Sequence, residues 1–209
     1  MLITGLTGGI ASGKSSAGKI IERLGGVIVD SDAVARHVVM PGEPALDEIV
    51  RRFGADVLDE GGVLDREKLR YIVFYDDTAL KDLNAIVHPA VYREIARRME
   101  EYRNNPNDKI LFLDIPLLYE SGGEALVDTV VVVYVDRKTQ IDRLMARDEF
   151  SREEAENRID KQMSLDEKRD RADFVIDNRG TLNDLEAETV RVFGELEAMR
   201  DRRRAAGGQ

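Results

Sequence analysis

Residues 8–15 read Gly8-Gly9-Ile10-Ala11-Ser12-Gly13-Lys14-Ser15, and this octapeptide matches the pattern G-x-x-x-x-G-K-[ST] of a phosphate-binding loop. The glycines permit backbone angles and a close approach to phosphate that a Cβ atom would block. The turn directs backbone N–H groups at the phosphates, and a helix beginning near Lys14 adds its positive end. We expect Lys14 to reach the β- and γ-phosphates and the Ser15 hydroxyl to ligate Mg²⁺.

The residues around this phosphate loop predict a β-α-β unit. Leu2–Leu6 is a short apolar run typical of a buried strand, and Val27–Val29 is a second one. Gly25-Gly26 suits the end of the helix between them. The apolar positions of that helix are spaced to form one face: Ala17, Ile20, Ile21 and Leu24. This context favours nucleotide binding over the alternative, a glycine-rich turn between strand and helix that holds no ligand.

Three further buried strands are predicted at Ile110–Leu113, Val130–Val135 and Phe174–Ile176. Their apolar residues do not alternate with polar ones, which is typical of a parallel sheet covered on both faces. The predicted fold is therefore α/β, a P-loop NTPase-type five-stranded parallel sheet flanked by helices.

We expect one domain over residues 1–209, with a core at approximately 1–40, 108–136 and 172–200. About eighty residues between the second and third strands lack a convincing strand and predict a helical insertion at approximately 41–107. Residues 137–171 are densely charged and helical, with a capping box at Ser151 and Glu154, and predict a lid. Arg202-Arg203-Arg204 and the five residues after it are expected to form a frayed tail.

Composition excludes several classes of function. Lys and Arg number 31 against 41 Asp and Glu, so the net charge of −10 disfavours nucleic-acid binding. The chain has no cysteine and only two histidines, which excludes disulfides, thiolate metal sites and multi-histidine metal centres. The N-terminus lacks a basic leader, and no apolar run approaches a membrane span. We expect a soluble, cytoplasmic protein that does not bind membranes.

Two carboxylates, Asp30 and Asp32, follow the second strand, at the edge where open α/β sheets bind ligands. One could accept the proton of an attacking hydroxyl, and the other could hold Mg²⁺ through water. Alternatively, either could cap the next helix, because Asp is a preferred N-cap residue.

Two arginines, Arg143 and Arg147, lie one helical turn apart and can point at one phosphate chain. Such arginines would exclude water and stabilise the charge of a transferring phosphoryl group. Alternatively, they are surface residues paired with the acidic side chains of Asp142, Asp148 or Glu149. A GTPase is disfavoured because the sequence has no guanine-reading N-K-x-D motif, so a kinase is the preferred interpretation.

Six segments of the sequence match the motifs of one kinase family in order and spacing. They are L-T-G-G-I-A-S-G-K-S-S at 6–16, V-D-S-D-A-V-A-R at 29–36, L-N-A-I-V-H-P at 83–89, D-I-P-L-L-Y-E at 114–120, R-L-M-A-R-D at 143–148 and V-I-D-N-R-G at 175–180. On these segments the chain resembles the dephospho-CoA kinase family from Leu2 to about Gly180. L-N-A-I-V-H-P and P-L-L-x-E separate this family from adenylate and shikimate kinases, which the phosphate loop alone would not do.

The resemblance implies that ATP phosphorylates the ribose 3′-hydroxyl of dephospho-CoA, with Mg²⁺. It implies a catalytic role for Asp32 as general base, together with Lys14 and Arg147. ATP would bind at Gly8–Ser16, where Ala11–Ser16 forms the phosphate loop with Gly13, Lys14 and Ser15 at its centre. It would also contact Arg143, Asn178 and Gly180. The insertion would be the CoA-binding domain. The partners of the whole protein would be ATP and dephospho-CoA.

The same resemblance implies acceptor contacts and a metal site. The expected substrate-binding residues are Asp32, Arg36, His88, Pro116 and Leu117, and the expected metal ligands are Ser15, Asp30 and Asp114. Arg36 could equally pair with an acidic neighbour, and the ring of His88 could instead cap a helix. The aromatic cluster of Tyr71, Phe74 and Tyr75 is either ordinary helix core or a surface that stacks on the substrate's adenine.

Two other functions remain open from the sequence. One is another nucleoside monophosphate-type small-molecule kinase, and the other is a non-catalytic ATP-binding module. The oligomeric state is expected to be a monomer or a small homo-oligomer.

Overall fold

The computed structural model describes residues 1–104 and 109–207. The chain forms two compact units, which are described separately: one contains Met1–Ile28 and Asn105–Gln209, and the other contains Val29–Asn104. The second unit begins at Val29, so the residues from there to Met40 group with the predicted insertion and not with the core. The boundary predicted between residues 107 and 108 lies outside the described residues.

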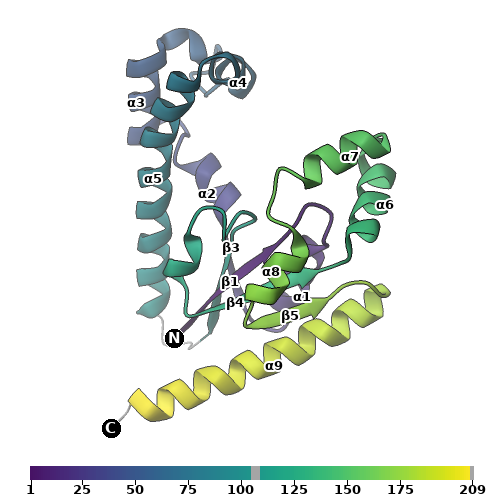
Figure 1. The fold of residues 1–209 in the computed structure, drawn as a ribbon. Helices are drawn as coiled ribbons and strands as arrows, with labels where there is room; N and C mark the ends of the chain where they lie inside the picture. Colours follow the sequence, from purple (N-terminus) through teal and green to yellow (C-terminus); the bar gives the residue numbers. More distant parts are fainter. Residues whose placement is uncertain (105–108, 208–209) are drawn as a thin grey trace. The chain divides into compact units, whose positions relative to one another are not determined.

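The first unit contains most of a five-stranded sheet with strand order β2-β3-β1-β4-β5 (Figure 1), and the unit boundary falls within β2. The pairs β1–β3, β1–β4 and β4–β5 are all parallel. The predicted α/β class is therefore confirmed. The strands are β1 (Leu2–Gly8), β2 (Val27–Asp30), β3 (Ile110–Asp114), β4 (Thr129–Tyr134) and β5 (Phe174–Asp177).

Apolar side chains cover both faces of this sheet. In β4, Val131 and Val133 belong to the cluster on one face, and Val130 and Val132 belong to the cluster on the other. The first face packs on α1 (Lys14–Arg23) and α9 (Leu182–Gly207), and the second packs on α8 (Leu165–Arg171). Burial on both faces explains why the strand residues do not alternate between apolar and polar.

The segment predicted as a lid forms three helices in the first unit, α6 (Arg137–Asp148), α7 (Arg152–Ile159) and α8. Ser151 and Glu154 form the predicted capping box at the start of α7. Figure 1 shows α6 and α7 side by side, and a small apolar cluster joins them. Ile10 and Ala11 of the phosphate loop pack against that cluster.

The prediction of a frayed tail from Arg202 onward is wrong for the described residues, because α9 continues to Gly207. Arg203 Nη1 lies 2.6 Å from Asp128 Oδ1, and the other oxygen of Asp128 accepts a hydrogen bond from Ile3 N. Arg203 thus attaches the end of α9 to Asp128, which in turn binds the start of β1. A short 3₁₀ helix at Gly123–Leu126 precedes Asp128.

The second unit is helical, as predicted for the insertion. Three helices, α2 (Ser31–His37), α3 (Pro44–Phe53) and α4 (Arg66–Tyr75), pack on α5 (Asp77–Arg103). A 3₁₀ helix at Ala55–Val57 lies between α3 and α4. Aspartates cap α4 and α5 because their side chains accept from two backbone N–H groups each.

The aromatic cluster on α4 is not helix core, so that interpretation is wrong. Tyr71, Phe74 and Tyr75 are 69%, 72% and 72% exposed, whereas Leu69 is the buried residue of α4. The rings contact one another edge to face, with centroids 5.1 Å and 5.0 Å apart. Stacking on an adenine therefore stays a prediction for this cluster.

A search of residues 1–104 and 109–207 finds no helix long and apolar enough to cross a membrane.

Candidate active site

The phosphate loop connects the buried strand β1 to α1. Gly13 caps α1 in the left-handed region with a φ of 89°, and Ala11 also has a positive φ of 59°. A Cβ atom on Gly13 would lie 2.1 Å from Asn178 Nδ2, so a side chain does not fit there. The sequence motif therefore reflects both backbone conformation and close packing at this position.

Lys14 forms an ion pair with Asp114, and both side chains are largely buried, at 16% and 13% exposure. Asp114 is the last residue of β3 and pairs in register with Leu6 of β1. The two charges therefore meet at the carboxyl end of the sheet, where α/β folds bind ligands. Asp114, which we expected to be a metal ligand, thus contacts the lysine of the phosphate loop.

Asn178 links the end of β5 to the phosphate loop. Its side chain is 4% exposed, and its Nδ2 donates to Ser12 O at 2.8 Å. Arg143 Nη2 in turn donates to Asn178 O at 2.9 Å. The structure therefore brings together Asn178, Arg143 and the phosphate loop, three elements that are far apart in the sequence.

Arg147 pairs with its neighbour Asp148 through hydrogen bonds of 2.9 Å and 2.8 Å. The carboxylate raises the pKa of the Arg147 guanidinium, and the guanidinium lowers the pKa of Asp148. This pairing is one of the two alternatives that the sequence left open. The side chain is nevertheless 59% exposed and also lines the cavity described next.

A cavity of about 540 Å³ lies over the phosphate loop, entirely within the first unit. Its charged lining residues are Lys14, Arg143 and Arg147, so it concentrates positive charge in a protein whose net charge is −10. A nucleoside triphosphate requires a locally positive site, because the negative electrostatic field of the whole protein would repel it. The lining residues are Gly9, Ala11, Ser12, Gly13, Lys14, Ser15, Ser16, Arg143, Arg147, Asn178, Gly180, Thr181, Leu182 and Leu185.

Three residues of the predicted lid form hydrogen bonds with the backbone of the phosphate loop, and the sequence did not predict them. Gln140 Nε2 donates to Ile10 O at 2.9 Å, and Ile10 N donates to Gln162 Oε1 at 2.9 Å. Lys168 Nζ lies 3.4 Å from Gly8 O. One available signal was that Lys168 follows Leu165 by three residues, which places it on the apolar face of the helix.

Asp30 and Asp32 differ in their contacts. Asp30 caps α2, because its Oδ1 accepts from Asp32 N at 2.8 Å and from Ala33 N at 3.0 Å. Asp32 is exposed in the first turn of α2, and its carboxylate has no hydrogen-bond or ion-pair partner in residues 1–104 and 109–207. The capping alternative thus holds for Asp30 and not for Asp32.

His88 and Arg36 also belong to the second unit. His88 is exposed in the middle of α5, directly before Pro89, so its ring does not cap a helix. Arg36 is exposed in the last turn of α2 and has no ion-pair partner in the described part of the chain. Both side chains are thus available to a ligand of this unit.

No group of three or more His, Asp or Glu side chains within residues 1–104 and 109–207 could hold a metal ion. Mg²⁺ often binds through one or two protein groups together with substrate phosphates. Ser15, exposed in the first turn of α1 beside the cavity, fits that kind of site. Asp114 fits it less directly, because its carboxylate binds Lys14.

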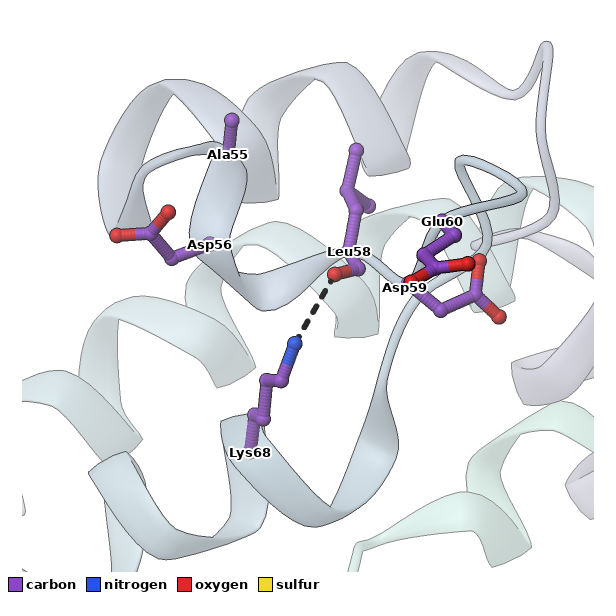
Figure 2. A pocket seen from close by; sticks show the side chains of 6 residues that line it. All are labelled: Ala55, Asp56, Leu58, Asp59, Glu60 and Lys68. Atoms are coloured by element: carbon purple, nitrogen blue, oxygen red, sulfur yellow. Dashed lines mark hydrogen bonds between the residues drawn. The ribbon is translucent and has the colours of Figure 1, made fainter.

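A second cavity, of about 630 Å³, lies in the second unit (Figure 2). Lys68 Nζ points to Leu58 O at 3.2 Å, and the other charged lining residues are the acids Asp56, Asp59 and Glu60. An acidic cavity does not suit an anionic acceptor. None of the predicted site residues lines it, so we do not assign it to substrate binding.

Comparisons with known proteins agree on one family. The family model described as dephospho-CoA kinase matches residues 2–184. A dephospho-CoA kinase of Symbiobacterium thermophilum is 50% identical over 188 residues, which are 90% of this chain and 78% of that protein. One from Halalkalibacterium halodurans is 48% identical over 192 residues, covering 92% and 95%. The solved dephospho-CoA kinase from Campylobacter jejuni is 31% identical, with a TM-score of 0.73 and coverage of 93% and 96%.

Proposed function

The chain belongs to the dephospho-CoA kinase family, and from this membership we propose that it transfers the γ-phosphoryl group of ATP to the 3′-hydroxyl of dephospho-CoA. The products are coenzyme A and ADP. The observation that carries the proposal is the basic cavity over the phosphate loop, in a chain that matches the family model over nearly its whole length. The protein is accordingly an ATP-dependent phosphotransferase.

The ATP side of the reaction uses the first unit. Backbone N–H groups of Ala11–Ser16 and the positive end of α1 would bind the phosphates. Lys14 would exchange its contact with Asp114 for the β- and γ-phosphate oxygens, and Arg143 and Arg147 would approach the same chain from α6. The base of the nucleotide would lie toward Gly180, which also lines the cavity.

Asp32 is the proposed general base. The 3′-oxygen of the acceptor forms a bond to the γ-phosphorus while the bond from that phosphorus to the β-γ bridging oxygen breaks. The hydroxyl proton passes to the Asp32 carboxylate, and ADP leaves. An exposed carboxylate with no protein partner in the described residues suits this role better than Asp30, whose oxygen caps a helix.

Mg²⁺ would be held by the ATP phosphates and the Ser15 hydroxyl, with Asp30 or Asp114 as an acidic support through water. When bound, it neutralises the charge that develops on the phosphates. Ser15 lines the cavity beside Lys14, which supports this assignment.

The acceptor side stays a prediction in its details. Arg36 and His88 of the second unit would contact dephospho-CoA, as would Pro116 and Leu117 after β3. ATP as phosphoryl donor favours a cytoplasmic location. The oligomeric state, monomer or small homo-oligomer, also stays a prediction.

An acceptor panel tests the proposed function. ADP release is measured with the purified protein, ATP and Mg²⁺ in the presence of dephospho-CoA, AMP, shikimate or gluconate. We expect turnover with dephospho-CoA to exceed the others by several powers of ten, because only dephospho-CoA carries all the groups that the proposed acceptor site would bind. Faster turnover with AMP would instead support a nucleoside monophosphate-type kinase. ATP binding without any acceptor-dependent turnover would support a non-catalytic module.

A further inference from the structure

Lys168 is a fully buried lysine on α8, with a side-chain exposure of 0%. Its ammonium has three oxygen partners: Gly8 O at 3.4 Å, Pro116 O at 2.9 Å and Glu120 Oε1 at 2.9 Å. An ammonium has three donors, so the three oxygens satisfy it. Burying such a charge is unfavourable unless its partners are in place.

The three partners belong to functionally different segments. Gly8 ends β1 and begins the phosphate loop, whereas Pro116 and Glu120 lie in the segment after β3, where acceptor contacts are predicted. Each of the latter has a further contact, because Pro116 O also accepts from Thr7 Oγ1 at 3.1 Å and Glu120 Oε1 from Met163 N at 3.0 Å. One ammonium therefore joins the phosphate loop, the segment after β3 and the lid segment.

We propose that Lys168 is a positioning residue for phosphoryl transfer, which fixes the phosphate loop and the Pro116 segment relative to each other. It touches neither substrate and acts through the carbonyl groups of Gly8 and Pro116. The inference rests on the proposed function, because it takes the two segments as donor and acceptor sites. Small displacements of reacting groups lower rates strongly, by about 10²-fold for about 1 Å.

Stability alone does not explain a charge at this position. Buried ion pairs can often be replaced by apolar residues of similar volume without loss of stability. Gln140 and Gln162 also bind the phosphate loop, but both contact Ile10 and neither has a hydrogen bond to the Pro116 segment within the described residues. Of these three side chains, only that of Lys168 contacts both the phosphate loop and the Pro116 segment in the part of the chain that the structure describes.

The first test variant is Lys168→Met, which keeps the length of the side chain and removes the charge. We expect kcat to fall by about 10²-fold, with a much smaller change in the KM for ATP. Hydrogen exchange of the peptide that contains the phosphate loop should be faster than in the wild type, while exchange in α9 stays the same. A merely structural role would not produce this local change together with a selective loss of kcat.

Glu120→Gln is the second variant and decides the question if Lys168→Met does not fold. Glu120 is 23% exposed, and glutamine keeps its hydrogen-bonding oxygen while removing the charge. We expect a loss of kcat in the same direction, about 10-fold, with faster exchange in the same peptide.

Thr129→Val is the matched control. Thr129 is also buried, and its hydroxyl donates to Asp173 Oδ2 at 3.0 Å, but it lies at the opposite end of β4 from the residue that pairs with Gly8. The inference is overturned if every test variant that folds keeps kcat within about twofold of the wild type, and Glu120→Gln alone decides where Lys168→Met does not fold. It is also overturned if Thr129→Val loses as much kcat at the same thermal stability. A wild type inactive on dephospho-CoA would contradict the proposed function instead, and hydrogen exchange would still report on Lys168.

Discussion

Lys14 is held by a carboxylate at the place where it is expected to bind phosphate. The partner, Asp114, ends the strand next to β1, and both side chains are largely buried. Nucleotide phosphates must therefore compete with Asp114 for the ammonium. A preformed ion pair can keep the lysine oriented, because buried opposite charges restrict each other's rotamers.

Lys14→Ala should lower kcat by several powers of ten while the protein stays folded. The reason is that the ammonium stabilises phosphate charge that develops during transfer. The measurement is steady-state ADP release at saturating ATP, with circular dichroism to check the fold. Lys19→Ala is the control, because Lys19 is an exposed residue of the same helix. A folded Lys14→Ala protein with near-normal kcat would contradict the assignment of the nucleotide site.

Asp32→Asn should lose the chemical step and keep ATP and dephospho-CoA binding. Asparagine retains most of the hydrogen bonding but cannot accept the proton, and general-base catalysis contributes about 10²–10⁴-fold. Asp30→Asn should lose less, because asparagine is also a good N-cap and preserves the start of α2. If Asp30 supports the metal, its deficit should shrink at high Mg²⁺.

Single-turnover transfer at saturating ATP, acceptor and Mg²⁺ compares these two variants without binding or product release. Asp30→Ala would add a loss of stability of about 1 kcal/mol from the missing cap, which separates its structural role from any catalytic one. A slower chemical step in Asp30→Asn than in Asp32→Asn would mean that the two roles are reversed.

At the scale of the element, the lid segment is attached to the phosphate loop. Ile10 and Ala11 pack against the cluster between α6 and α7, and Gln140 and Gln162 bind the backbone of Ile10. The phosphate loop therefore depends on the same helices that carry Arg143 and Arg147. A change in the position of these helices would therefore displace the loop that is proposed to bind ATP.

Arg147→Ala should reduce phosphoryl transfer more than it weakens dephospho-CoA binding. The side chain comes from α6 and lines the cavity over the phosphate loop, and it belongs to a different unit from the predicted CoA-binding helices. The measurements are kcat and the acceptor affinity from calorimetry. Asp148→Ala is a matched control, since it removes the carboxylate that pairs with Arg147 and leaves the guanidinium. A large loss of acceptor affinity at unchanged kcat would instead place Arg147 at the acceptor site.

Elements with a strong local pattern could be predicted from the sequence, and elements that depend on distant partners could not. The phosphate loop, the five strands and the capping box at Ser151 follow from spacing within a few residues. The helical end at Arg203 depends on Asp128, and the buried position of Lys168 depends on carbonyl groups of two other segments. Arg203 and Lys168 each lie among many other charged residues, so the local sequence does not indicate that either has a partner far away in the chain.

At the scale of the whole molecule, acidic residues exceed basic ones, and many carboxylates are held in their charged form. Arginine or backbone N–H groups lower the pKa of carboxyl groups in both units, including Asp65, Asp136, Asp177 and Glu188. A carboxyl whose pKa is lower in the folded state stabilises the fold above its unfolded pKa. That stabilisation disappears as the pH falls through the folded pKa.

Glu94 on α5 offers the sharpest test of this acid sensitivity. Hydrogen bonds from Arg97 and then Arg98 lower the pKa of Glu94 from 4.5 to about 2. Its contribution should be complete above about pH 4.5 and should be lost progressively between that pH and about pH 2. Urea unfolding followed by circular dichroism should therefore show the wild type losing stability from about pH 5 to about pH 3. Glu94→Gln should start less stable and lose less over the same interval, because it has no proton to bind. Parallel losses in the two proteins would mean that the Arg97–Glu94–Arg98 contacts do not contribute to stability in solution.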